Sequence, residues 1–107
     1  MTTMKDRESG FEAKFASDEA LEFKAQARRD RLLATWIGEQ MGLTGEALAD
    51  YVTAVWRADL KEPGDQDVFD KVMADVETKG LTVTGAELRA KMDELLAQAR
   101  TELHEGR

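Results

Sequence analysis

The sequence predicts an all-α protein, a four-helix bundle with a long first helix and a flexible N-terminal arm. Hydrophobic residues recur three and four positions apart along four stretches, which is the pattern of amphipathic helices. Glycines, the single proline and helix-capping residues separate these stretches. The connections between the stretches are short, and short connections favour antiparallel packing of successive helices.

The first helix is expected to run from about Asp18 to Met41. Ser17 can cap its N-terminus, and Gly42 suits the left-handed position that follows many helices. A helix of about 24 residues would be roughly 36 Å long, which is longer than the others. Its hydrophobic residues are dense only in the second half, so we expect the first half to overhang the bundle.

Three shorter helices are expected downstream, over about 45–61, from 65 or 67 to 79, and from 85 toward the C-terminus. Thr84 and Glu87 have the spacing of a capping box at the start of the last helix. Trp36 and Trp56 both lie on hydrophobic stripes, and we therefore expect them in the core or at its edge.

Composition limits the classes of function. The 107 residues suit one domain, and the net charge of −7 disfavours binding to nucleic acid or to an anionic membrane surface. The chain contains no cysteine, which excludes disulfides and thiol catalysis and agrees with a reducing cytosol. No hydrophobic run approaches the ~18 residues of a membrane-spanning helix. The charged start of the chain does not resemble a secretory signal.

Motifs for catalysis, metal binding or cofactor binding are weak or incomplete. Residues 80–85 have the glycine spacing of a phosphate loop, but Ala86 stands where the loop needs its lysine. Residues 65–70 fail as a calcium loop because Phe69 occupies a ligand position. His104 is the only histidine and is expected on the surface. The carboxylates are expected on charged, exposed faces, so we expect no catalytic residue, no metal and no cofactor.

The N-terminal arm, residues 1–17, differs from the rest of the chain. Residues 1–31 carry as many positive as negative side chains, so the net negative charge belongs to the remainder. Phe11 and Phe15 are four residues apart and would share one face of a helix, although Gly10 weakens a helix there. We expect the arm to be disordered alone and to fold on a partner, with an ordinary disordered terminus as the alternative.

Basic side chains also gather further along the chain. Lys24, Arg28 and Arg31 fall on one face of the predicted first helix. Guanidinium and ammonium groups on one face can bind carboxylates of a partner protein. This face is therefore a second candidate for partner binding.

Three stretches carry a resemblance to a known family. They are residues 11–16 (FEAKFA), residues 23–33 (FKAQARRDRLL) followed by Trp36, and residues 62–69 (EPGDQDVF) with Lys71. Their combination resembles the ζ subunit of the F-type ATP synthase of α-proteobacteria, an inhibitor of ATP hydrolysis. The resemblance extends over essentially the whole chain, and residues 6–8 (DRE) also fit it.

The resemblance implies that the protein is not an enzyme and that its partner is the catalytic head of the ATP synthase, made of α, β and γ subunits. The N-terminal segment would enter a catalytic interface between α and β, reach toward γ and block rotation in the hydrolytic direction. The protein would be cytoplasmic and peripheral to the membrane-bound enzyme. Together with the basic face, the resemblance implies that ten residues bind the partner: Met4, Lys5, Asp6, Arg7, Glu8, Phe11, Lys14, Phe15, Lys24 and Arg28.

The predicted organisation is thus an inhibitory arm, residues 1–17, followed by a bundle, residues 18–107. Two alternatives remain at this point. The basic face could belong to a small sensor that binds ATP or ADP weakly, or the bundle could be a generic helical module for protein interaction.

Overall fold

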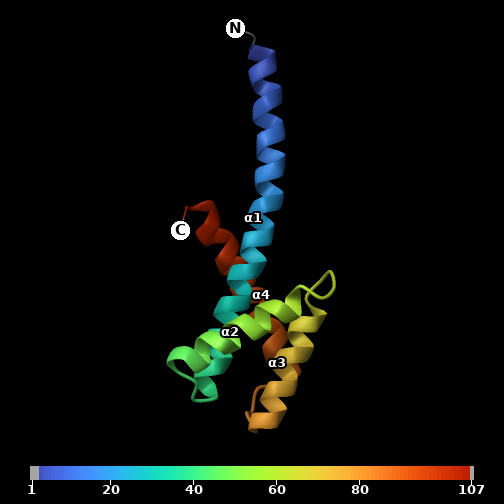
Figure 1. Ribbon diagram of the computed structural model, residues 1–107. Coiled ribbons are helices and arrows are strands. Elements are labelled where there is room, and N and C mark those ends of the chain that lie inside the picture. The colour runs from blue at the N-terminus through green and yellow to red at the C-terminus, as the bar shows by residue number, and fades with distance from the viewer. Residues whose placement is uncertain (1–2, 107) are drawn as a thin grey trace.

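The computed structural model describes the backbone of residues 3–106 and the side chains of residues 19–106. The described residues form four helices and no strand, which confirms the predicted all-α fold. Figure 1 shows that α1 is much longer than the others and that its N-terminal part projects away from them. The helices, in chain order, are α1 (Thr3–Gln40), α2 (Gly45–Asp59), α3 (Gln66–Lys79) and α4 (Gly85–His104).

The start of α1 differs from the sequence prediction. The helical backbone begins at Thr3, not at Asp18, so Ser17 lies within the helix. More than half of residues 3–16 are of types that favour helices (Met, Lys, Arg, Glu and Ala), none is proline, and a serine inside a helix costs well under about 1 kcal/mol. The predicted flexibility of the arm, and the exposure of Phe11 and Phe15, concern side chains outside the described residues and stay predictions.

The other helices begin and end close to the predicted residues. Thr84 and Glu87 form the predicted capping box, in which the Glu87 amide donates to the Thr84 hydroxyl at 3.1 Å. The Thr84 amide donates in return to the Glu87 carboxylate at 3.3 Å. Gly80 follows α3 with a φ of 68°, a left-handed conformation that glycine adopts without strain. Local signals therefore determine where these helices stop and start.

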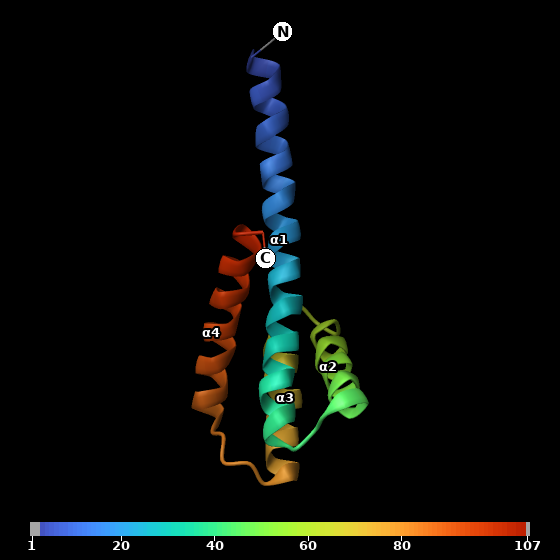
Figure 2. The ribbon, with the colours of Figure 1, turned by 90° about the vertical axis from the view of Figure 1, so that its left-hand side faces the viewer.

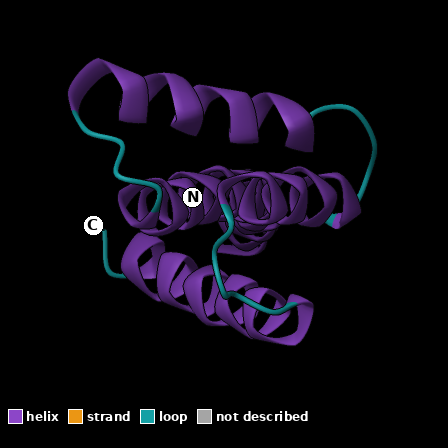
Figure 3. Cartoon of the chain, turned by 90° about the horizontal axis from the view of Figure 1, so that it is seen from below, coloured by secondary structure: helices purple, strands orange, loops and turns teal. Residues whose placement is uncertain are grey.

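The helices form three layers, in which α3 and α4 run in opposite directions and α2 lies obliquely across α1 (Figure 1). Viewed along the bundle, α1 and α3 lie in the middle, with α2 on one side and α4 on the other (Figures 2 and 3). The core lies between these layers and is aliphatic, formed by Leu33, Ala34, Ile37, Val55, Val68, Val72, Val76, Leu88, Met92 and Leu95. Trp36 packs at its edge, as predicted, with Lys91 Nζ 5.2 Å from the ring centroid.

A buried charge cluster lies where all four helices meet. Arg29 and Asp30 on α1 are 2% and 0% exposed, and Arg29 Nε donates to Asp30 Oδ1 at 2.7 Å. The Arg29 guanidinium also lies 3.9 Å from a carboxylate oxygen of Asp59 at the end of α2. It lies 3.8 Å from Asp65, which precedes α3, and Asp65 accepts a 2.6 Å hydrogen bond from Arg89 on α4. The expectation that all carboxylates lie on exposed faces is therefore wrong for Asp30.

The environment of Asp30 favours its protonated form. Burial raises the pKa of the Asp30 carboxyl to about 8, and the neighbouring Asp59 carboxyl adds to the shift, although Arg29 acts against it. Asp30 Oδ2 is buried and has no hydrogen-bond partner within the described part of the chain, which favours a proton on this oxygen. The cluster can thus hold three carboxyl groups around Arg29 without three full negative charges.

We predict that the free energy of unfolding decreases as the pH rises from about 4 to about 8. In this range the unfolded chain has lost the Asp30 proton, since its ordinary pKa is 3.8, while the folded protein retains it. Urea denaturation at several pH values should show a slope of up to about 1.4 kcal/mol per pH unit from this group. Asp30→Asn should flatten the profile, whereas Asp93→Asn, at an exposed position of α4, should not. Parallel profiles for Asp30→Asn and wild type would contradict this assignment.

We also predict that Arg29→Met destabilises the fold by about 3–5 kcal/mol, because it leaves buried carboxyl groups without their cation. Arg100→Met is the control. Arg100 pairs with Glu22 at the surface, with half of its side chain exposed, and should cost about 1 kcal/mol or less. Urea denaturation of both variants at one pH provides the comparison. Equal losses would show that Arg29 does not hold the helices together.

Candidate partner-binding surface

The predicted binding residues fall into two groups. Eight belong to the arm, where the described structure is limited to the helical backbone of α1: Met4, Lys5, Asp6, Arg7, Glu8, Phe11, Lys14 and Phe15. The other two, Lys24 and Arg28, lie on the next turns of the same helix. Lys24 is exposed, and Arg28 is half-buried and donates to Glu102 on α4 at 3.1 Å. One helix therefore carries all ten residues.

The predicted basic face exists as a surface hollow between α1 and the end of α4. Its volume is about 270 Å³, and both Lys24 and Arg31 are exposed beside it. The residues that line it are Phe23, Lys24, Ala27, Arg28, Arg31 and Leu103. The structure thus brings together the three basic side chains that the sequence placed on one face.

An apolar patch, defined here as Phe23, Ala27, Trp56 and Leu60, adjoins this hollow. Phe23, Trp56 and Leu60 are 62%, 37% and 54% exposed, and they are the exposed large hydrophobic residues among the described side chains. Together with Gln26 and Asp59, the patch lines a second hollow of about 70 Å³ between α1 and the end of α2. Phe23 and Ala27 border both hollows, so the apolar and basic surfaces are continuous.

Sequence reasoning did not identify this patch. The expected second helix, about 45–61, includes Leu60, but α2 ends at Asp59 and leaves Leu60 more than half exposed. Trp56 lies at the margin of the buried face, because it is one residue, or about 100°, from the fully buried Val55. The available signal was Phe23, a large aromatic residue among many charged neighbours in the polar half of the predicted first helix.

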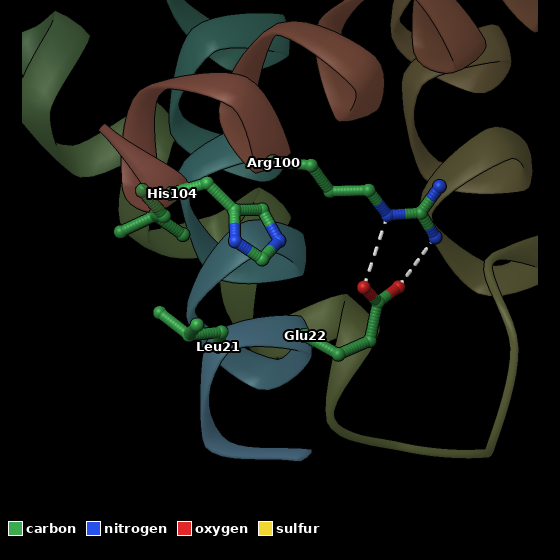
Figure 4. A pocket seen from close by; sticks show the side chains of 5 residues that line it. Leu21, Glu22, Arg100 and His104 are labelled. Carbon is green, nitrogen blue, oxygen red and sulfur yellow. Dashed lines mark hydrogen bonds and ion pairs between the residues drawn. The ribbon is translucent and has the colours of Figure 1, made fainter. Parts of the chain in front are cut away.

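A third hollow, of about 250 Å³, lies between α1 and the end of α4. Figure 4 shows its lining residues, with His104 beside Leu21 and with Arg100 facing Glu22. Arg100 donates two hydrogen bonds to the Glu22 carboxylate, at 3.0 and 2.5 Å, and these lower the Glu22 pKa. His104 is exposed, as predicted. The charges here satisfy each other, which favours a structural role for the pair.

These surfaces suit contacts with another protein better than a small ligand. The three hollows have volumes of about 250 Å³, 270 Å³ and 70 Å³, below the range of about 300–1,000 Å³ that is typical of small-molecule pockets. Another hollow, of about 320 Å³ beside Trp36 and Lys91, lies at the lower end of that range. Among residues 19–106, no group of three or more His, Cys, Asp and Glu side chains is placed to hold a metal ion. None of the helices, over the residues described, has the length and hydrophobicity to cross a membrane.

Comparisons with known proteins agree with the fold. A protein whose structure was determined in solution by NMR superposes with a TM-score of 0.69 and is 37% identical in sequence. The match covers 81% of this chain and 99% of that one. No curated protein matches the sequence.

The sequence model of one protein family, described as ATPase inhibitor subunit zeta, matches residues 1–102. The match includes the arm, the apolar patch and the residues of the buried charge cluster. It confirms the family that the sequence resembles. The chain therefore belongs to the ATPase inhibitor subunit zeta family.

Proposed function

We propose that this protein is a regulatory, non-catalytic subunit that inhibits ATP hydrolysis by an F-type ATP synthase. The observation that carries the proposal is the family match over residues 1–102, which includes the arm as well as the bundle. In this proposal the arm enters a catalytic interface between an α and a β subunit, reaches toward γ and blocks rotation in the hydrolytic direction. The protein then acts in the cytoplasm, on the head of the membrane-bound enzyme.

The shape of the molecule supports a division between an inserting arm and an external stop. The helix α1 has 38 residues, which corresponds to about 57 Å, and the other helices pack along its C-terminal part (Figure 2). The molecule measures 63 × 26 × 22 Å. A single helix is only about 10–12 Å wide with its side chains. An interface that admits the arm can therefore exclude the bundle.

The chemistry of the arm suits a buried interface. Phe11 and Phe15 supply aromatic groups of the kind that dominate binding energy at protein interfaces. Lys5, Arg7 and Lys14 can pair with acidic groups of the enzyme. An arm that is flexible before binding loses entropy when it orders on the enzyme, which keeps its binding reversible. Inhibition then requires only that the arm bind one rotary state of the enzyme more tightly than the others.

We predict that deletion of residues 2–18 abolishes inhibition while the bundle stays folded, because Ala25 is the first buried side chain among the residues whose side chains are described. The assay is ATP hydrolysis by the purified synthase head at increasing concentrations of the full and the truncated protein. Circular dichroism and urea denaturation of the truncated protein test whether the bundle remains intact. Equal inhibition by the two proteins would show that the arm is not the inhibitory element.

We predict that Phe15→Ala raises the half-inhibitory concentration by about 30-fold, the effect of losing about 2 kcal/mol at an interface hot spot. Ser9→Ala, in the same segment but outside the aromatic pair, is the control and should change it little. Both variants should keep the wild-type free energy of unfolding. If Phe15→Ala inhibits like Ser9→Ala, the phenylalanine is not an anchor.

A further inference from the structure

The apolar patch lies next to the arm on the same helix. Position 23 follows position 15 by eight residues, so the two backbone positions are about 12 Å apart along α1 and about 80° apart around it. A protein that encloses the arm up to position 15 is therefore within side-chain reach of Phe23. The end of α2 adds Trp56 and Leu60 to the same surface.

The clustering of the patch residues distinguishes them from ordinary surface hydrophobics. Single exposed leucines are common and carry no information, whereas contiguous exposed apolar groups mark interaction sites. Here all three exposed large hydrophobic residues among the described side chains lie around one hollow. Phe23 and Trp56 are also of the aromatic type that is enriched at interface hot spots.

The charges beside the patch indicate what kind of surface it fits. Lys24 and Arg31 are exposed at the adjoining hollow, although the chain as a whole carries a net charge of −7. Asp59, the acidic residue at the patch itself, is largely buried and faces Arg29. The exposed charge next to the patch is therefore positive, and a complementary partner surface is apolar with carboxylates at its border.

We propose that the apolar patch, with Lys24 and Arg31, is a second docking site that binds an amphipathic, acidic segment on the outer surface of the ATP synthase head. This inference rests on the proposed function, since it places the same enzyme at both contacts. The arm determines inhibition, and the patch holds the bundle against the entrance. Two linked contacts bind more tightly than either alone, because binding at the first raises the local concentration of the second.

Because the chain contains no cysteine, single cysteines can carry a photo-crosslinking label at chosen positions. Leu60→Cys places the label in the patch, and Thr53→Cys, at another exposed position of α2, is the matched control. We expect the label at 60, but not at 53, to crosslink to a synthase subunit when the full-length protein inhibits the enzyme. A crosslink from 60 to a second copy of this chain, or no difference between the two positions, overturns the docking site.

Affinity measurements test the same proposal. Phe23→Gln combined with Leu60→Gln should raise the Kd for the synthase head about tenfold, since two exposed hydrophobic contacts are lost. The double control Thr53→Gln with Thr78→Gln, at exposed positions of α2 and α3, should not. Lys24→Glu should raise the Kd and weaken its dependence on salt, whereas Lys79→Glu should not. Equal Kd values for patch and control variants overturn the docking site.

The two proposals can fail separately. If the wild-type protein does not inhibit ATP hydrolysis, the proposed function is wrong, and the docking site is rejected with it. If the wild-type protein inhibits and deletion of the arm abolishes inhibition, the function stands. In that case, equal crosslinking from positions 60 and 53, together with equal Kd values for the patch and control variants, rejects the docking site alone.

Discussion

The fold depends on how Arg29 is buried. One guanidinium group at the centre of the molecule approaches carboxylates at the end of α2 and before α3, and Asp65 extends the contact to Arg89 on α4. The aliphatic core could pack in several registers, because valine and leucine contacts are not directional. Arg29 attracts the carboxylates of Asp59 and Asp65 as ion pairs at 3.9 and 3.8 Å, and Arg89 donates a 2.6 Å hydrogen bond of defined geometry to Asp65, so these contacts favour one register of the helices. We interpret the cluster as the element that sets the arrangement of the helices around α1.

That arrangement explains how a small bundle presents a long helix. The helices α2, α3 and α4 cover only the C-terminal part of α1, and the contacts of Arg29 fix them at one level along it. Closer to the N-terminus of α1, the Glu22–Arg100 pair forms another contact between α1 and α4. In the proposed function, the projecting part of α1 is the segment that binds the enzyme. The division of α1 into a packed C-terminal half and a projecting N-terminal half therefore follows from where the polar contacts lie.

Much of the fold was predictable because its signals are local. Caps, glycines and hydrophobic spacing placed α2, α3 and α4 within about two residues, and the capping box at Thr84 was confirmed. The burial of Asp30 was not predictable, since the sequence around it, Arg-Arg-Asp-Arg, has the composition of an exposed face. Its burial depends on Asp59 and Asp65, which are distant in sequence.

The candidate site was predictable in part for the same reason. The basic face of Lys24, Arg28 and Arg31 follows from helical spacing alone and appears in the structure. The apolar patch needs the end of α2 beside α1, which is a tertiary arrangement that spacing does not reveal. The start of α1 was misplaced because Ser17 resembles a cap, although the backbone continues through it.

The continuity of α1 has a mechanical consequence. Since α1 has no break between Thr3 and Gln40, the direction in which the arm's side chains point is coupled to the orientation of the bundle whenever the arm is helical. Each residue of an α-helix advances the direction of its side chain by about 100°, so adding one residue near position 18 would turn the arm's surface away from its original side. The orientation of the bundle thus determines which side of the arm faces the partner protein.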